Sequence, residues 1–429
     1  MQRRTLAAGF VLLPATLLAG QAQGQQGGAQ QAGGSAEQRA VLRFYADLGQ
    51  AMFEDALTAA RALQAAIGHF LATPSEQGLA AARRAWVAAR APYAPTEALR
   101  FGNPEMDERE GNVNAWPLDE GLIDKVDPRY GTESDENPLY TANIIASRSL
   151  AFAGETHDLS TLTPRLLRDL HQAAGVEANV TLGYHAIEFL LWGQDLHGTG
   201  PGAGERPFTD YTTADHAGRR GQYLRIAASL LVEDLEDMLA QWQPGGAIRR
   251  RLAASPAPQG IAGMVTGIGS LAYGELAGER MKLGLLLHDP EEEQDCFSDN
   301  THNSHRGNVL GMAAIWRGEW TRLDGTTLRG PSLRNLVDRA NRRLREEVDA
   351  RFATTLAAFD ALRQRAETTE AYDQMLAEGN TAGNATIQAG IDALLALTRS
   401  IERVAAALKL PAIRFEGSDS LDDPAKVFK

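Results

Sequence analysis

Cysteine, valine and isoleucine are scarce in this sequence of 429 residues, and basic residues are fewer than acidic ones. Cys296 is the single cysteine, which excludes an intramolecular disulfide and a cysteine-based zinc finger, and its place in the chain argues against a lipid anchor. The 42 Lys and Arg residues are outnumbered by 55 Asp and Glu, and the net charge of −13 argues against binding to nucleic acid or anionic lipid. Valine and isoleucine are few and alanine is abundant, which favours helices over sheet.

Residues 1–24 have the features of a signal peptide. Arg3 and Arg4 precede a short apolar segment that Pro14 interrupts, and small residues follow. The arginine pair is also a partial twin-arginine signal, so the export route stays open. The Gln- and Gly-rich stretch 25–38 predicts a flexible tether. We therefore expect an exported, periplasmic, soluble protein that is not a lipoprotein and has no membrane-spanning segment in its mature chain.

Apolar residues recur at helical spacing through the rest of the chain. After Pro331 the apolar stripe from Leu333 to Phe359 predicts one long helix, and a second helix is predicted from about Val176 to Trp192. No convincing run of alternating strand residues is present. The sequence therefore predicts an all-α fold.

A stretch rich in glycine and proline, HGTGPGAG, begins at His197 and indicates a boundary between two parts of the chain. We predict two helical-bundle domains related by internal duplication, with a functional cleft at their interface. The predicted parts are an N-terminal bundle over 39–196, a linker over 197–218, a C-terminal bundle over 219–412 and a tail over 413–429.

The segment TLGYHAIEFLLWGQD contains the pattern G-x-H-x-x-E, formed by Gly183, His185 and Glu188. On a helix His185 and Glu188 are three residues apart and share a face, as two metal ligands in a helical bundle would. Asp195 follows further along that face. A glycine within a helix costs about 1 kcal/mol relative to alanine, which suggests close approach of another backbone or of a ligand at Gly183. The alternative is a buried hydrogen bond between His185 and Glu188 in the core.

Three of the nine histidines fall within residues 288–305. Asp289 and Pro290 predict a helix start there, with the aspartate as N-cap and the proline at the first helical position. Asp299 and His302 are candidate metal ligands. Asp299 can equally cap the helix that follows, because residues 298–301 are poor helix formers.

Two further segments pair carboxylates with arginines, which is typical either of structural ion pairs or of site carboxylates with orienting partners. Their similar placement suggests the two copies of a diverged duplication, although the pattern is Glu-x-x-Arg in one segment and Glu-Arg in the other. The residues concerned are Tyr93, Glu97 and Arg100 in the first segment and Glu275, Glu279 and Arg280 in the second. Asp119 lies in a third conspicuous segment, NAWPLDEGLID.

These segments together resemble the imelysin-like family. The resemblance rests on GYHAIEFLLWGQDL, PYAPTEALRF, NAWPLDEGLID, GELAGERMKLGL and DCFSDNTHNSH, and it covers roughly residues 39–410. It implies two helical bundles related by duplication, with the G-x-H-x-x-E motif on the wall of a cleft between them. It also implies export to the bacterial envelope and a link to iron, since relatives include iron-regulated proteins and periplasmic parts of iron-uptake systems. The family is also classed as a peptidase, by analogy between His-x-x-Glu and zinc carboxypeptidase ligands.

We predict a binding protein for iron, another metal or an iron-bearing ligand, contributing to iron uptake with an envelope transport component as partner. Carboxylates with imidazole suit iron. The predicted metal ligands are His185, Glu188, Glu97, Asp299 and His302. Predicted supporting or ligand-binding residues are Gly183, Tyr93, Arg100, Asp119, Asp195, Glu279 and Arg280.

Two alternatives remain from the sequence. The same residues could hold zinc in a metallopeptidase with Glu97 or Glu188 as the base, although H-E-x-x-H is missing and no catalytic residue can be assigned. Alternatively, the protein could bind a small organic ligand without metal.

Overall fold

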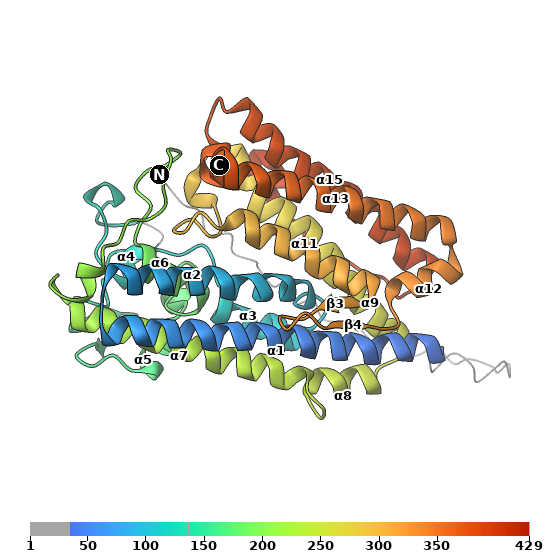
Figure 1. Cartoon of the computed structure of the whole chain (residues 1–429), viewed down its shortest axis with the longest axis horizontal. Helices are drawn as coiled ribbons and strands as arrows, with labels where there is room; N and C mark the ends of the chain where they lie inside the picture. Colours follow the sequence, from blue (N-terminus) through green and yellow to red (C-terminus); the bar gives the residue numbers. More distant parts are fainter. Residues whose placement is uncertain (1–34, 135–136, 429) are drawn as a thin grey trace.

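The computed structural model describes residues 35–134 and 137–428, of which 67% are helical and 4% are in strands. Helices α1, α7 and α8 run along one side of the molecule and α13 and α15 along the other, with α9 and α11 between them (Figure 1). The predicted signal peptide and most of the predicted tether lie outside the described residues.

The first group of helices is built around α1. These helices are α1 (Ala36–Ala72), α2 (Glu76–Tyr93), α3 (Pro104–Asn114), α4 (Glu120–Ile123), α5 (Pro164–Leu170), α6 (Gly183–Trp192), α7 (Ala217–Trp242) and α8 (Ala247–Ala254). Ser35 and Gln38 form a capping box, so α1 begins three residues before the predicted start of the bundle. α1 packs against both α2 and α7.

Trp242 at the end of α7 shows how closely this group packs. Its ring lies edge-on to Tyr45, with ring centres 5.4 Å apart. A Cβ on Gly49 would lie 2.4 Å from the Trp242 ring, so only glycine permits this contact. α7 begins at the end of the predicted linker and packs with α1, α3 and α6. The division of the chain at residues 197–218 stays a prediction.

The second group of helices is built around α15. Its helices are α9 (Ala257–Ser270), the π-helix η5 (Leu271–Lys282), α10 (Leu283–Leu287), α11 (Thr301–Arg317), α12 (Leu333–Ala340), α13 (Arg342–Thr368), α14 (Tyr372–Leu376), α15 (Thr381–Ala407) and α16 (Asp419–Asp422). α15 packs on α13, η5 and α9, and α13 also packs on α11. Short 3₁₀ turns complete the helical part of the chain: η1 (Ala94–Leu99), η2 (Pro128–Tyr130), η3 (Ala173–Gly175), η4 (Phe208–Tyr211), η6 (Pro290–Glu292) and η7 (Pro424–Lys426).

Two predicted helices are wrong in their extent. The long helix predicted after Pro331 is two helices, because Asn341 has an extended backbone and its side chain accepts the Leu344 amide, which caps α13. The helix predicted from about Val176 begins only at Gly183. The apolar stripe continued across both breaks and therefore concealed them.

The fold is mostly helical, but it also contains short β-strands, which the predicted all-α fold lacks. Two antiparallel hairpins are present, β1 (Ser149–Phe152) with β2 (Glu155–Asp158) and β3 (Glu319–Thr321) with β4 (Thr327–Arg329). Each strand has only three or four residues, which is too short to show an alternating pattern in the sequence.

The two groups of helices meet where α11 crosses η1. A Cβ on Gly311 would lie 1.9 Å from the Pro95 carbonyl oxygen, and a Cβ on Gly307 would lie 2.7 Å from the Ala94 side chain. The Asn308 side-chain amide donates to the Ala94 carbonyl oxygen at 2.9 Å. These contacts fix α11 against η1 and bring the conspicuous segments of both halves together.

No helix among the described residues is both long enough and apolar enough to cross a bilayer. The internal duplication is not visible in any measured feature of the fold and stays a prediction.

Candidate metal centre

The first turns of α6 place His185 and Glu188 side by side. Gly183 opens this helix with a φ of +78°, and a Cβ there would lie 2.4 Å from the Val113 carbonyl oxygen. The close backbone approach expected at this glycine is therefore confirmed. His185 Nδ1 lies 3.0 Å from Glu188 Oε2, one helical turn away. Both side chains are buried, with 1% and 0% of their surface exposed.

Asp295 comes to this pair from the segment before α11. One ligand atom from each of His185, Glu188 and Asp295 lies within 4.8 Å of the others, so the three could hold one metal ion. Asp295 Oδ1 is 3.9 Å from His185 Nδ1, and Asp295 is fully buried. An imidazole with two carboxylates is a donor set that suits iron, manganese or zinc. We call these three residues the candidate metal triad.

Arg90 orients Asp295 from α2. Its guanidinium lies 2.7 Å from Asp295 Oδ1 and donates to Asn114 Oδ1 at 2.6 Å. It also lies over the rings of Trp86, Tyr93 and Tyr184 at 5.2 to 5.7 Å, which stabilises a buried cation. Its positive charge would weaken binding of a metal ion by electrostatic repulsion, while its hydrogen bonds fix the carboxylate that the ion would use.

Asp295 and Glu188 have further donors that fix their orientation. Asn300 and Ser304 both donate to Asp295 Oδ2. The Ser298 amide and hydroxyl donate to Glu188 Oε1 at 3.0 and 2.6 Å. Both oxygens of Asp295 and one oxygen of Glu188 thus accept hydrogen bonds from protein donors.

The protonation states of the triad follow from burial. Burial, assisted by the Arg90 charge, lowers the pKa of His185 to about 3, so its imidazole is neutral at pH 7. Burial and the Asp295 charge raise the pKa of Glu188 well above its ordinary value. Burial alone would raise the pKa of Asp295, but the Arg90 and His185 neighbours and the Ser304 hydroxyl lower it to about 2.

These states fit a metal ion. A neutral imidazole is the form that coordinates metal, and His185 Nε2 has no hydrogen-bond partner among the described residues. An ion would favour the ionised form of Glu188 and displace its proton. The triad therefore offers donor atoms of the kinds that a metal ion needs, and an ion held by His185 Nδ1 would replace the contact between that nitrogen and Glu188.

Glu97, a predicted metal ligand, lies in a neighbouring network and not in the triad. It pairs with Arg280 at 2.8 Å and accepts hydrogen bonds from Tyr93 at 3.0 Å and Asn114 at 3.3 Å. Asn114 also accepts from Arg90, so Glu97 is connected to the triad through two side chains. Its assignment as a metal ligand stays a prediction.

Arg280 and Arg100 belong to the same network. In a π-helix residues five apart face each other, and Arg280 pairs with Glu275 at 2.6 Å within η5. Arg100 lies 3.4 Å from Glu110 and 3.6 Å from Glu275. Burial, with the charges of Glu97 and Glu275, raises the pKa of Glu110 to about 7 against the opposing effect of Arg100.

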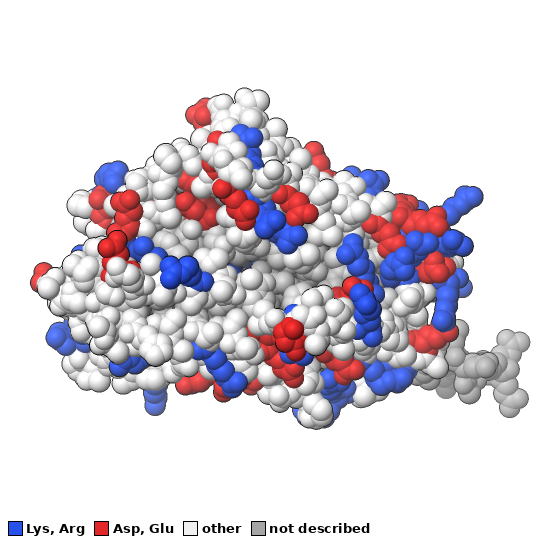
Figure 2. Space-filling model, in the orientation of Figure 1, with Lys and Arg blue, Asp and Glu red and all other residues white. Residues whose placement is uncertain are grey.

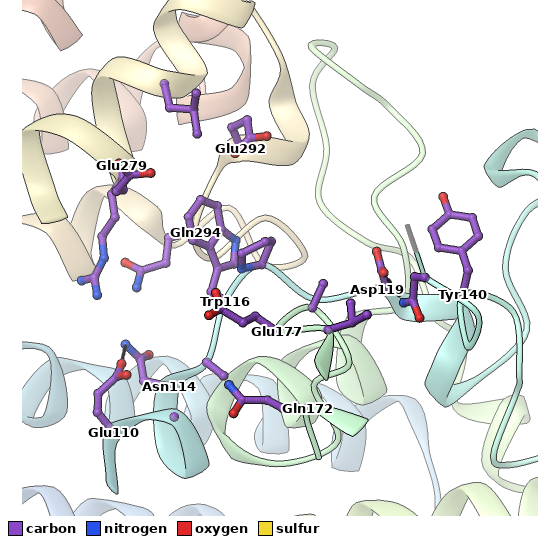
Figure 3. A pocket seen from close by; sticks show the side chains of 18 of the residues that line it. Glu110, Asn114, Trp116, Asp119, Tyr140, Gln172, Glu177, Glu279, Glu292 and Gln294 are labelled. Carbon is purple, nitrogen blue, oxygen red and sulfur yellow. Dashed lines mark hydrogen bonds between the residues drawn. The ribbon is translucent and has the colours of Figure 1, made fainter. Parts of the chain in front are cut away.

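A cavity of about 980 Å³ lies beside this network. Its walls come from residues 100–178 and from residues 275–294. Glu279 and Gln294 face it from one side and Glu110 and Asn114 from the other (Figure 3). The face of the molecule shown in Figure 2 is hollowed near its centre, with acidic and basic side chains around the rim.

The remaining predicted residues lie in three places. Asp119 lines the cavity and accepts from the Asn137 amide at 2.6 Å. Asp299 and His302 are not part of the triad. Asp299 precedes Asn300, the N-cap of α11, and Asp299 Oδ1 makes no hydrogen bond with any described residue. His302 Nε2 lies 3.0 Å from the Asn303 amide. Asp195 accepts from the His197 backbone at 2.8 Å.

Sequence reasoning missed Arg90, Ser298 and Asp295 as a member of the candidate metal triad. Asp295 stands in the acidic stretch before α11, but its distance of more than a hundred residues from His185 gives no spacing signal. Arg90 stands just before the PYAPTEALRF segment, and no local pattern distinguishes it from a surface arginine.

Comparison with known proteins supports the family predicted from these segments. The sequence profile of the imelysin family matches residues 49–401, which is most of the chain. The chain belongs to the imelysin family. This imelysin is 23% identical over 317 residues to Iron-regulated protein A of Synechococcus elongatus, covering 71% of this chain and 70% of the relative.

A solved structure has a similar fold. It is that of a protein named as an iron-regulated protein A precursor from Parabacteroides distasonis, with a TM-score of 0.62 and 18% sequence identity. The match covers 89% of this imelysin and 97% of the other chain. At this identity the likeness concerns the fold alone.

Proposed function

We propose that this imelysin binds a metal ion, with iron as the preferred ion, through His185, Glu188 and Asp295. The observation that carries the proposal is the convergence of one imidazole and two carboxylates within 4.8 Å in a fully buried position. Buried carboxylates without a compensating cation are costly, and Arg90 compensates only one of the two. A bound cation would compensate the other.

The choice of iron rests on two supports. Mixed nitrogen and oxygen donors suit iron and disfavour calcium or magnesium. The similar proteins are named as iron-regulated, which ties them to the same element. From this we propose a role in iron uptake, with the exported protein passing iron to a transport component of the cell envelope.

The cavity is the proposed route by which a cation reaches the triad. Nine carboxylate side chains and only three guanidinium groups line it, so its surface would attract cations. Asn114 lines the cavity and accepts from Arg90, which in turn holds Asp295. The triad is therefore separated from the cavity by this Asn114 and Arg90 layer. Glu97, Tyr93 and Arg280 would act by positioning that layer.

The test is metal binding by the chelator-stripped protein, measured by calorimetry with Fe²⁺ under anaerobic conditions and with Mn²⁺ and Zn²⁺ in parallel. We expect one ion at the triad, with the affinity lowered about a hundredfold or more in His185→Ala. His69→Ala, which removes an exposed histidine of α1, is the matched control and should bind like the wild type. Glu188→Gln keeps the shape of the side chain and serves if His185→Ala does not fold. Binding that is unchanged in both triad variants, or no binding of iron at all, would refute the proposal.

The metallopeptidase alternative has less support from the geometry. Glu97, one of its predicted bases, is already paired with Arg280 and accepts from Tyr93. Chelator-sensitive cleavage of a peptide library that is lost in Glu188→Gln would establish the metallopeptidase in place of the metal-binding protein.

The metal-free alternative would be established if the protein, purified from its native compartment, proved free of metal by elemental analysis while retaining an organic ligand.

A further inference from the structure

A second group of acidic side chains lies apart from the triad. One carboxylate oxygen from each of Glu293, Asp299 and Asp373 lies within 4.8 Å of the others. Glu293 and Asp299 flank the segment that contains Asp295, and Asp373 comes from α14. The group shares no residue with the triad.

The two innermost carboxylates of this group have no charged partner. Glu293 and Asp373 are 0% and 1% exposed, and none of their side-chain oxygens has a described donor in good hydrogen-bond geometry. The nearest donors are neutral, the Thr301 hydroxyl at Glu293 and the Gln374 amide at Asp373. No described arginine, lysine or histidine lies within ion-pair distance of Glu293, Asp299 or Asp373. Burying such groups without a well-placed donor or a counter-ion costs several kcal/mol each, so buried carboxylates that face one another without either are an unusual feature.

Burial and the negative charges of neighbouring carboxylates raise the pKa values in this group. Burial and the Asp299 charge raise the pKa of Asp373 to about 8. Burial and the charge of Asp195, a fourth carboxylate nearby, raise the pKa of Asp299 to about 6.

We propose that Glu293, Asp299 and Asp373 form a second cation site that takes a hard divalent ion such as Ca²⁺ or Mn²⁺. The donors are all oxygens, which such ions prefer, and no imidazole or thiol is included. Ligand oxygens on opposite sides of a calcium ion lie up to about 5 Å apart, and all three oxygens lie within 4.8 Å of one another, close enough to share a single ion. The second site thus differs in chemistry from the triad.

Asp299 gives the site its open side. It is half-buried, whereas Glu293 and Asp373 are fully buried, so an ion would enter past Asp299 and keep water ligands there. Asp299 also has a left-handed backbone with a φ of +55°, a conformation that aspartate and asparagine tolerate better than other side chains. His288 holds the chain that leads to Glu293 against α14, which carries Asp373. Its Nδ1 lies 2.7 Å from the Leu376 carbonyl oxygen at the end of α14.

The experiment is calcium and manganese binding to the full, chelator-stripped chain, with the stoichiometry measured by equilibrium dialysis and elemental analysis. We expect one Ca²⁺ per chain in the wild type and in His185→Ala, and an affinity lower by about tenfold or more in Asp299→Asn and Glu293→Gln. Asp299→Asn is the most informative variant, because asparagine keeps the shape and the left-handed backbone. Glu378→Gln, an exposed carboxylate just beyond α14, is the matched control and should bind as the wild type does.

Thermal unfolding provides a readout that does not depend on counting ions. The metal-free Asp299→Asn protein should melt at a higher temperature than the metal-free wild type, because one repelling charge is gone. Calcium should raise the melting temperature of the wild type and leave that of Asp299→Asn unchanged. If the carboxyls are relieved by protons alone, the wild type binds neither ion and its melting temperature does not respond to calcium, which overturns the proposal. Binding lost in His185→Ala and kept in Asp299→Asn also overturns it, and that result leaves the triad proposal intact.

Discussion

At the scale of single residues, the site depends on side chains whose neighbours determine their chemistry. His185 and Glu188 would be an ordinary pair on a helix if Asp295 and Arg90 were elsewhere. With Asp295 Oδ1 lying 3.9 Å from the imidazole and 2.7 Å from the Arg90 guanidinium, the pair becomes part of a donor set that can hold a metal ion. Gly183 makes this arrangement possible because it allows α6 to start against the Val113 carbonyl.

Gly183→Ala tests that role. A Cβ at this position is strained by the left-handed backbone and would also lie 2.4 Å from the Val113 carbonyl oxygen. We expect the free energy of unfolding to fall by about 3 kcal/mol, measured by urea denaturation.

Gly175→Ala is the control for Gly183→Ala. Gly175 has a φ of +72° and no neighbouring atom within 4 Å of its Cβ position, so it should lose only about 1 kcal/mol through backbone strain. Equal losses in the two variants would show that the contact with Val113 contributes nothing.

The local part of the candidate site was predictable from the sequence. The i,i+3 spacing of His185 and Glu188 places them on one face of any helix, and their contact is confirmed. The remaining assignments required contacts across the fold. Asp299 was a candidate ligand of the same ion, but it lies with Glu293 and Asp373 because the chain turns through a left-handed residue just before α11.

At the scale of elements, caps and glycines decide where helices end and how closely they pack. Thr163 caps α5 through the Leu166 amide, and Gly193 follows the last residue of α6. The break at Asn341 escaped prediction because the apolar stripe continues through it. The π-helix η5 also has no sequence signature, although it brings Arg280 onto Glu275.

Gly311→Ala tests the contact between α11 and η1. A Cβ there would lie 1.9 Å from the Pro95 carbonyl oxygen, so α11 must move away from η1. We expect a loss of about 3 kcal/mol or more in the free energy of unfolding, because backbone atoms cannot rearrange as a flexible side chain can.

Gly68→Ala provides the comparison for Gly311→Ala. Gly68 is an exposed glycine within α1 with nothing near its Cβ position. The substitution should stabilise the protein by about 0.5 to 1 kcal/mol through helix propensity. A similar small effect at Gly311 would contradict the close packing of α11 on η1.

At the scale of the whole molecule, buried charges connect segments that are far apart in the sequence. Asp124 follows α4 and accepts hydrogen bonds from Arg206 at 2.7 Å and from Arg220 at 2.6 and 2.9 Å. Arg206 lies in the predicted linker and Arg220 lies in α7. The linker is therefore joined to α7 and to the end of α4 by side chains that are all buried.

Asp124 predicts a specific dependence of stability on pH. Burial alone would raise the pKa of Asp124, but the hydrogen bonds and charges of Arg220 and Arg206 lower it from 3.8 to about 2. A carboxylate with a lowered pKa stabilises the fold above its unfolded pKa and loses that contribution as the pH falls toward its folded pKa. The wild type should therefore lose about 2 kcal/mol from this group between pH 5 and pH 2.

Asp124→Asn isolates this effect. At pH 7 it should cost about 3 to 5 kcal/mol, because two buried guanidinium groups lose their charged partner. The difference in unfolding free energy between wild type and variant, measured by urea denaturation at several pH values, should shrink as the pH falls from 5 to 2. A difference that stays constant over this range would contradict the assignment.

The sequence by itself determined the class of the fold, the family and the pairing of His185 with Glu188. Helical periodicity, caps and i,i+3 spacing act over a few residues and can be read without the rest of the chain. The tertiary structure alone decided that Asp295 joins His185, that Glu97 pairs with Arg280, and that Asp299 joins a separate carboxylate group. Those contacts join residues of different elements, and their geometry depends on how α2 packs on α6 and α11, and how α11 packs on η1 and η5.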